Sequence, residues 1–477
     1  MKTRLFISRL MPLFILALSV LPWAVASQPA PQVPPPGSPF AGIWQGDLTL
    51  PQGGSIRIVF HVSAKSDGSY VATLDSPDQG TTGIPVSGVT VDKKAIRLDL
   101  AAMGGDYTGN LQPDGSLDGK WTQRGVSMPL LLKHVDKAAA VSRPQMPKAP
   151  FPYRVEDVAY TSKPGVTLSA TFTLPPGQGP FPAVLLVPGS GASDRDESVF
   201  GHKPFLVLAD YLTRRGIAVL RADRRGVGKS TGDLANSTDA DYADDALAGL
   251  AFPKARKEVN PKSIGIVGHS EGGLVAARVA AVSPDVAFIV LMASPGLPGE
   301  QIVLAQQNLI LRSRGASEEA IKTKRAQQEK VLQIVIREKD PAVAEKQLRE
   351  FMKAFIPPGT PAAVVDARFK AMLSPWYRDF LVYDPRPALK KVKCPVLAVA
   401  GEKDIQVPAT ENLAAIQNAL KEGGNTSNTE KILPGLNHLF QPAQTGDPTE
   451  YAKVEITIAP AALEFVGEWI SAQVKGR

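Results

Sequence analysis

The sequence has few of the residues from which disulfides and metal sites are built. Its 477 residues include one cysteine and five histidines, so no intramolecular disulfide can form. That cysteine, Cys394, begins an apolar run and is predicted to be a buried, unreactive thiol. No clustered Cys/His or His-x-x-Glu pattern indicates a metal site, and we expect neither a metal nor another cofactor.

Long apolar runs are missing beyond the N-terminus. Residues 10–21 are apolar, follow a basic start and precede the small-residue pattern Ala24-Val25-Ala26. These features predict a secretory signal peptide over residues 1–26, and therefore export to a bacterial periplasm or secretion. No later segment offers about 20 uninterrupted apolar residues, so we expect no membrane span in the mature protein.

The charge balance is only weakly basic. The formal net charge is +7, and removing Lys2, Arg4 and Arg9 with the signal peptide leaves +4. No stripe of lysine and arginine with interleaved aromatics is present, so we expect no nucleic-acid partner. The expected partner is a small-molecule substrate, and the sequence is compatible with a homodimer.

The rest of the chain divides into four predicted segments. Residues 27–39 are proline-rich and read as an extended tether. Residues 40–136 alternate short apolar runs with turn signals, which predicts a small all-β barrel or sandwich. Residues 137–152 form an Ala/Pro linker. Residues 153–477 alternate buried strands with helices, which predicts an α/β fold with a mostly parallel sheet covered on both faces. Within them, residues 299–390 are helical and are expected to cap the C-terminal edge of the sheet.

An apolar strand runs directly into Gly268-His269-Ser270-Glu271-Gly272, and a small-residue helix follows. In this strand–turn–helix context the serine sits on a tight bend with its hydroxyl exposed. The flanking glycines are explained by the lack of room for a Cβ at such a bend. Ser270 is therefore predicted to be a nucleophile, with a glycine-rich turn and a capping serine as the structural alternative.

A serine nucleophile needs a base, and the five histidines leave little choice. Two of them lie in the predicted β domain, and His269 occupies the variable slot beside the serine, where it is expected to point elsewhere. His438 lies in a loop directly after an apolar strand and is the predicted base. His202 is expected to cap or line the rim of the cleft.

The base in turn needs an orienting acid. The strand ending at Ala400 runs into a loop that carries two carboxylates. Asp404, which lies 34 residues before His438, is the predicted acid. Glu402 is the rival, with a solvated turn charge as its structural explanation.

The order Ser270…Asp404…His438 is that of α/β-hydrolases. From about residue 150 onward the chain resembles this superfamily, most closely the EstD-like bacterial carboxylesterases, which also carry a β-rich N-terminal domain. The resemblance rests on residues 187–191, 194–197, 223–230, the serine motif, 401–404 and 436–438. It implies an α/β-hydrolase fold with a helical cap and cleavage of carboxylic esters without a cofactor.

The loop of residues 188–191 follows a predicted strand and is expected to supply half of an oxyanion hole. One donor is predicted to be the N–H of Glu271, and the other that of Ser190 or Gly191; the sequence does not decide between them. The adjacent charge run Asp194–Glu197 is either a solvated face or a supporting ion-pair network.

Two other motifs have competing explanations. In the cap, Trp376 and Tyr377 are candidate walls of a substrate pocket, or else they pack the cap onto the body. Residues 226–230 resemble the end of a phosphate-binding loop, but that motif requires glycine at position 223, where Asp223 stands. We expect this loop to have a structural role.

The predicted function is therefore a serine hydrolase that acts on carboxylic esters through an acyl-enzyme. The same triad also cleaves thioesters and peptides, so a thioesterase or a prolyl-oligopeptidase-like exopeptidase is the alternative. An N-terminal segment of about 100 residues is too short for the propeller of such peptidases. A non-enzymatic alternative is a protein that binds an apolar ligand in its β domain on an inactive hydrolase scaffold.

Overall fold

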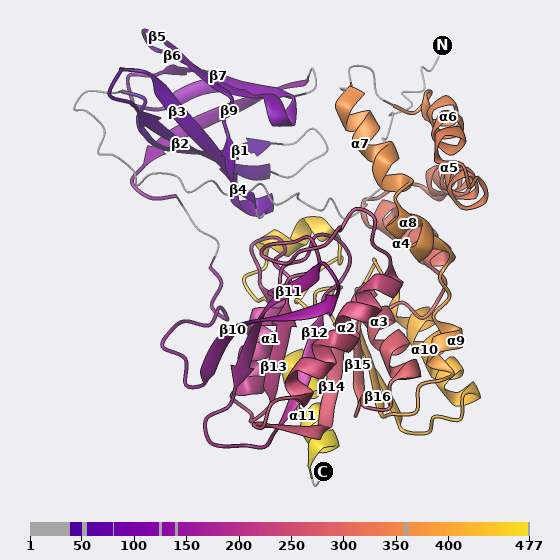
Figure 1. Ribbon diagram of the computed structural model, residues 1–477. Helices are drawn as coiled ribbons and strands as arrows, with labels where there is room; N and C mark the ends of the chain where they lie inside the picture. The colour runs from indigo at the N-terminus through magenta and orange to yellow at the C-terminus, as the bar shows by residue number, and fades with distance from the viewer. Residues whose placement is uncertain are drawn as a thin grey trace.

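The computed structural model of the chain describes residues 39–49, 55–79, 81–123, 126–138, 142–356, 360 and 362–475. The predicted signal peptide and nearly all of the predicted tether lie outside these ranges. Two sheets dominate the described part, one antiparallel and near the N-terminus, the other mostly parallel (Figure 1).

The antiparallel sheet curls into an all-β domain. Its strand order is β4-β3-β2-β1-β9-β8-β7-β6-β5, and Val86, just before β5, donates a backbone hydrogen bond to Ala72 of β3. Because β5 follows β4 closely along the chain and also contacts β3, the two ends of the sheet meet. The interior is filled by large aromatic side chains, among them Trp44, Tyr107 and Trp121, each 2% exposed or less. The strands are β1 (Gly42–Thr49), β2 (Ser55–Ala64), β3 (Tyr70–Ser76), β4 (Thr81–Pro85), β5 (Gly88–Asp92), β6 (Ala95–Leu100), β7 (Gly105–Leu111), β8 (Leu117–Gln123) and β9 (Val126–Val135).

The second sheet has the order β10-β11-β13-β12-β14-β15-β16-β17. The first two strands pair antiparallel, and all pairs from β13 to β17 are parallel. Its central strands are buried on both faces, which explains their unbroken apolar runs. The strands are β10 (Arg154–Lys163), β11 (Val166–Leu174), β12 (Phe181–Val187), β13 (Ala218–Ala222), β14 (Val259–His269), β15 (Ile289–Met292), β16 (Val396–Gly401) and β17 (Asn428–Leu433).

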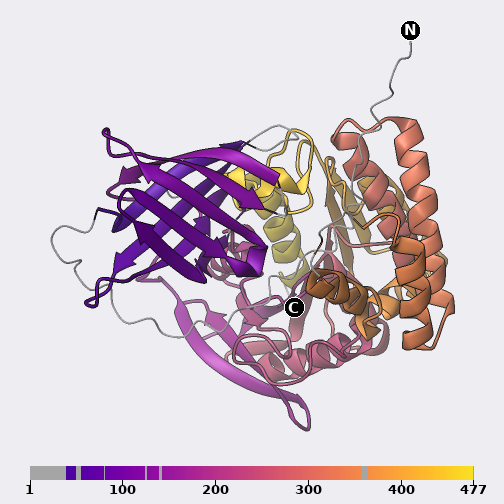
Figure 2. The same cartoon turned by 90° about the horizontal axis from the view of Figure 1, so that it is seen from above.

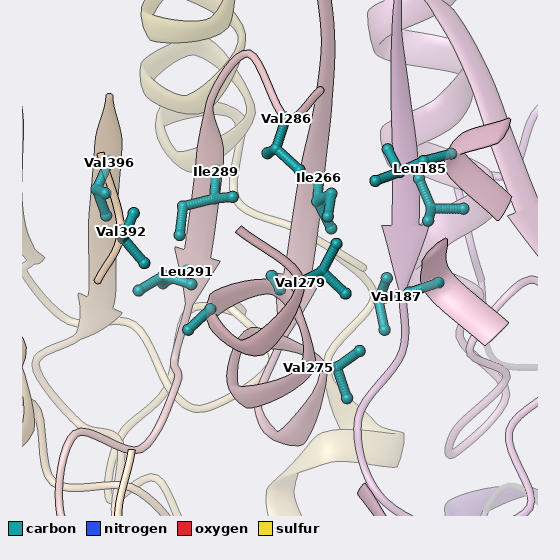
Figure 3. Packing of buried hydrophobic residues seen from close by; sticks show 14 of the residues in the cluster. Leu185, Val187, Ile266, Val275, Val279, Val286, Ile289, Leu291, Val392 and Val396 are labelled. Atoms are coloured by element: carbon teal, nitrogen blue, oxygen red, sulfur yellow. The ribbon is translucent and has the colours of Figure 1, made fainter. Parts of the chain in front are cut away.

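Helices cover both faces of this sheet. On one face α2 (Asp239–Lys254), α3 (Glu271–Val282) and α10 (Ala409–Glu422) bury apolar side chains against the strands. Figure 3 shows Val275 and Val279 of α3 packed beside β12 and β14. On the other face α1 (Pro204–Thr213) and α11 (Pro460–Val474) form a second core. Within the described ranges, every helix is too short or too polar to cross a membrane.

A helical insertion separates β15 from β16. It consists of α4 (Gly299–Ser313), α5 (Glu318–Arg337), α6 (Pro341–Met352), α7 (Ala362–Met372) and α8 (Pro375–Val382), and the short α9 (Arg386–Leu389) leads back to the sheet. The insertion has an apolar core of its own. Figures 1 and 2 show it and the all-β domain on opposite sides of the same end of the sheet. There η1 (Pro77–Gln79) of the all-β domain contacts η3 (Pro448–Lys453).

Candidate active site

Ser270 forms the bend between β14 and α3. Its backbone has φ 52° and ψ −122°, a conformation that L-residues rarely adopt. The bend is tight because a Cβ at Gly268 would lie 2.1 Å from the carbonyl oxygen of Gly272, and one at Gly272 would lie 2.0 Å from that of Val187. Only glycine fits at these two positions. The strained serine is the local signature of a nucleophile elbow.

His438 and Asp404 form a buried pair beside this bend. His438 Nδ1 lies 2.7 Å from Asp404 Oδ2, while Oδ1 of the same carboxylate accepts hydrogen bonds from the backbone N–H groups of Gln406 and Val407. A carboxylate held in this way stabilises a proton on Nδ1 and leaves Nε2 free to accept one. The His438 ring centroid lies 4.9 Å from that of His269, the residue before Ser270.

Among the described residues, Ser270 Oγ makes no hydrogen bond to the His438 ring. The structure thus joins the predicted acid to the predicted base and brings His438 to the bend at Ser270, while the contact from Ser270 to His438 is not formed. Such contacts are often long in enzymes without substrate and shorten when it binds.

Glu402, the rival acid, and His202 have other roles. Glu402 is exposed and accepts a hydrogen bond from the Gly435 N–H. His202 is fully buried, with Nδ1 2.9 Å from Thr457 Oγ1 and Nε2 3.0 Å from the Tyr451 carbonyl. Burial, with Arg143 nearby, lowers the pKa of His202 to about 4. His202 thus holds the C-terminal loop together from within and does not line a cleft rim.

The loop after β12 passes directly beside Ser270. A Cβ at Gly189 would lie 3.3 Å from Ser270 Cβ. The Gly189 N–H donates to Glu197 Oε1 at 2.6 Å and is therefore not available to a ligand. In the described part of the chain, the N–H groups of Ser190, Gly191 and Glu271 have no acceptor within the protein. These three groups include both pairs predicted to form an oxyanion hole.

Arg224 is a buried residue whose importance was not evident from the sequence. Its Nη1 lies 2.9 Å from Glu271 Oε2, and its Nη2 donates to the carbonyls of Pro188 (3.1 Å) and Gly189 (2.9 Å). The guanidinium lies over the ring of Tyr242 at 4.0 Å. The loop that carries Arg224 was expected to be structural, and the only available signal was its position among the residues on which the family resemblance rests.

The charge run Asp194–Glu197 is a network and not a solvated face. Arg195 Nη2 lies 2.7 Å from Asp223, and Asp196 pairs with Arg221 and Lys203. Glu197 is buried and contacts His269 Nδ1 at 2.9 Å. The network holds the segment that follows residues 188–191, which we call the oxyanion loop after their predicted role.

The two cap aromatics have different environments. Trp376 of α8 donates its indole N–H to Glu271 Oε1 and stacks on Phe380, with ring centroids 5.8 Å apart. It therefore lies beside the elbow. Tyr377 is 3% exposed within the apolar core of the cap, so it packs the cap and offers no free surface to a substrate. The prediction of Tyr377 as a pocket wall fails because its side chain points into that core.

Glu271 also has a second carboxyl beside it. Asp239, at the start of α2, is fully buried. Burial, followed by the nearby Glu271 carboxylate, raises the pKa of Asp239 well above its ordinary value. A protonated Asp239 can donate to Glu271, and we infer from this raised pKa that the pair carries one negative charge opposite Arg224. Within the described residues, no group of three or more His, Cys, Asp and Glu side chains is arranged to hold a metal ion.

Comparison with known proteins identifies the family. A model of the "Alpha/beta hydrolase family" matches residues 184–454, more than half of the chain. The chain belongs to the α/β-hydrolase family. This agrees with the predicted fold class, in which a mostly parallel, doubly covered sheet follows an all-β domain.

Two curated relatives align with parts of this α/β-hydrolase. "Esterase EstD" of Thermotoga maritima is 28% identical over 306 residues, which span 64% of each protein. "Uncharacterized protein YfhR" of Escherichia coli K12 is 29% identical over 126 residues, or 26% of this chain and 41% of the relative. The matched regions thus span less than two thirds of either relative. Among solved structures, the Pyrococcus furiosus esterase PF2001 aligns at 17% identity with a TM-score of 0.42, over 71% of this chain and 98% of its own.

Proposed function

We propose that this α/β-hydrolase cleaves carboxylic esters through an acyl-enzyme formed on Ser270. The observation that carries the proposal is the meeting of three parts at one bend. A strained serine, a buried His438–Asp404 pair and backbone N–H groups without acceptors all lie there. Together they provide a nucleophile, a base with its orienting acid, and donors for a developing oxyanion.

In the proposed acylation, His438 Nε2 takes the proton of Ser270 Oγ as the oxygen attacks the ester carbonyl carbon. The carbonyl oxygen becomes an oxyanion that accepts hydrogen bonds from the Glu271 N–H and from that of Ser190 or Gly191. Asp404 stabilises the His438 imidazolium. When the intermediate collapses, His438 gives the proton to the leaving alcohol oxygen. In deacylation, water attacks the acyl carbonyl carbon while His438 takes its proton. His438 then returns the proton to Ser270 Oγ as the carboxylic acid is released.

The packed interior of the all-β domain argues against the alternative of a protein that binds an apolar ligand there. Its core side chains, including Phe60 and Trp121, are packed against one another and buried. Their ring centroids are 6.4 Å apart, and the Tyr107 ring lies 5.8 Å from Phe60. An apolar ligand would have to displace these side chains. The relative named as an esterase favours esters over peptides as the substrate class.

The test is turnover of a p-nitrophenyl ester series by the wild type and by Ser270→Ala. We expect kcat/KM to fall on the order of 10³-fold or more in Ser270→Ala. Ser263→Ala is the matched control, because Ser263 is buried on the same strand and lies seven residues before the nucleophile. It should retain full activity. Turnover by Ser270→Ala comparable to that of the wild type would refute the assignment of Ser270 as the nucleophile.

The substrate class requires a second comparison. An ester, a thioester and an anilide with one common acyl group should be hydrolysed in parallel. We expect the ester to have the highest kcat/KM relative to its uncatalysed rate. Faster anilide turnover would identify a peptidase, and preferred thioester turnover a thioesterase.

A further inference from the structure

The two variable residues of the elbow, His269 and Glu271, both carry buried ionisable side chains. Each pairs with a residue of another segment, His269 with Glu197 and Glu271 with Arg224. The side chains of these four residues are 9% exposed or less. Taking charges out of water is unfavourable unless their partners are well placed, and a buried ion pair is weak evidence for stability. Two such pairs on either side of one serine therefore call for another explanation.

The first pair joins the oxyanion loop to the base. Glu197 Oε1 accepts from the Gly189 N–H at 2.6 Å and lies 2.9 Å from His269 Nδ1, while His269 Nε2 lies 3.0 Å from the carbonyl oxygen of His438. That carbonyl can only accept, so Nε2 must carry a proton. A proton on both ring nitrogens satisfies both contacts. Burial opposes this charged form, but the Glu197 carboxylate prevails and raises the pKa of His269.

The second pair holds the same loop from the opposite side. Arg224 Nη1 binds Glu271 and also lies 3.3 Å from the Gly191 carbonyl. Its Nη2 donates to the carbonyls of Pro188 and Gly189. Only a guanidinium has enough donors in one plane to make these contacts together.

The two pairs together fix the planar peptide unit between Pro188 and Gly189. The carbonyl of Pro188 and the N–H of Gly189 belong to one trans peptide unit and point in opposite directions. Arg224 binds that carbonyl and Glu197 binds that N–H, so the unit is held from both sides. The next unit contains the Gly189 carbonyl, which Arg224 holds, and the Ser190 N–H. Arg224 therefore also fixes the direction of a predicted oxyanion donor.

We propose that Glu197–His269 and Arg224–Glu271 are paired clamps that orient the oxyanion peptide of residues 188–191 relative to Ser270. All four are positioning residues, since their side chains act through the loop and not on the substrate. The proposal rests on the proposed function and adds a role for the two variable residues of the elbow. In the first clamp, His269 also ties the loop to the backbone of the base.

The experiment compares Glu197→Ala and Arg224→Lys with Arg225→Lys. Arg225 is the next residue, is equally buried and pairs with Asp241 and Asp245, and in the described part of the chain it makes no hydrogen bond to the oxyanion loop. It therefore controls for the loss of a buried guanidinium. Each variant is assayed for kcat and KM on one p-nitrophenyl ester, for its melting temperature and for the rate of Ser270 labelling by a fluorophosphonate. The phosphonyl oxygen of that probe occupies the oxyanion hole.

We expect kcat and the labelling rate to fall about 10- to 100-fold in Glu197→Ala and Arg224→Lys, because the oxyanion peptide would be displaced from Ser270. KM should change less than about threefold. Glu197→Gln should recover most of this loss, because its amide oxygen can still accept from the Gly189 N–H. Arg225→Lys should lower the melting temperature and leave kcat and labelling within about twofold of wild type.

Two failures are distinguishable. A wild type that neither hydrolyses esters nor labels at Ser270 overturns the proposed function, and the clamps with it. If the wild type labels at Ser270 and both clamp variants keep kcat within twofold, only the clamps are wrong. The same holds if Arg225→Lys loses as much activity as Arg224→Lys. Should Arg224→Lys not fold, the Glu197→Ala and Glu197→Gln pair decides the question alone.

Discussion

The all-β domain and the hydrolase body bury very different side chains. In the described part of the all-β domain, the buried polar residues are Ser76 and Ser116, and its core is aromatic and aliphatic. In the body, buried charged residues gather at the carboxyl ends of β12, β13 and β14, around Ser270. Burying charge is unfavourable unless it is paired, so a chain keeps it where it has a use. The contrast indicates that the first domain is built for packing and the second around a site.

The strongest test of this contrast removes a charge from the site. Asp404→Asn keeps the size of the side chain but lets it donate toward His438, which favours the wrong tautomer of the base. We expect kcat to fall about 10³- to 10⁴-fold with little loss of folding stability. Ester turnover and thermal unfolding would be measured together.

Glu402→Gln is the matched control for Asp404→Asn. Glu402 lies in the same loop, but among the described residues its carboxylate accepts a side-chain hydrogen bond from the Gly435 N–H alone. Its substitution should leave kcat nearly unchanged. Equal losses in the two variants would mean that the loop, and not the Asp404 carboxylate, supports the base.

The converse test removes an aromatic side chain from the all-β domain. Trp121 is almost fully buried there, and Trp121→Ala leaves a cavity that should lower the free energy of unfolding of this domain by about 3–5 kcal/mol. The kcat of folded protein should stay within about twofold, measured below the first thermal transition. Val126→Ala is the control, because Val126 is exposed. A loss of kcat in folded Trp121→Ala would show that this domain takes part in the site.

The sequence was sufficient for the parts of the fold and site that depend on local pattern. The unbroken apolar runs predicted the parallel strands, and the glycines of the elbow predicted the bend at Ser270. His438 and Asp404 were selected by their places after strand ends, where a parallel sheet brings such loops together. The structure does bring these two side chains into contact.

Contacts between distant segments could not be predicted in this way. Nothing local distinguishes Arg224, which holds the oxyanion loop, from Arg225, which holds α2. Tyr377 and Trp376 are neighbours on one short helix, yet one enters the cap core and the other reaches Glu271. The rotation of α8 about its axis decides which of the two side chains enters the cap core. That rotation depends on how the cap packs against the hydrolase body. His269 points away from Ser270, as expected, but its contacts with Glu197 and the His438 carbonyl were not predicted.

A smaller effect is expected where the cap meets the site. Trp376→Phe keeps an aromatic ring beside Phe380 but removes the N–H that reaches Glu271. Loss of one hydrogen bond to a buried carboxylate should lower kcat/KM by about tenfold or less. Trp469→Phe is the matched control, because its N–H binds Thr429 on the far side of the sheet. Unchanged kinetics in Trp376→Phe would mean that this contact only attaches the cap.

The smallest expected effect concerns pH and the buried carboxyl pair. The folded protein retains the Asp239 proton to a higher pH than the unfolded chain does, since the pKa of Asp239 is raised well above 3.8. Its contribution to stability is therefore complete below pH 3.8 and is lost as the pH rises through the folded pKa. The asparagine introduced in the Asp239→Asn variant cannot ionise. The melting temperature of this variant minus that of the wild type should therefore increase from pH 5 to pH 9.

Asp241→Asn provides a control of opposite sign for this pH effect. Burial raises the pKa of Asp241, but hydrogen bonds from Lys163 and Thr238 prevail and lower it to about 2. The contribution of Asp241 is therefore present above pH 3.8 and lost only as the pH falls toward 2. The difference in melting temperature between Asp241→Asn and wild type should stay constant from pH 5 to pH 9. If Asp239→Asn behaved in the same way, Asp239 would be ionised throughout, and Arg224 would face two negative charges in a part of the body where we infer one.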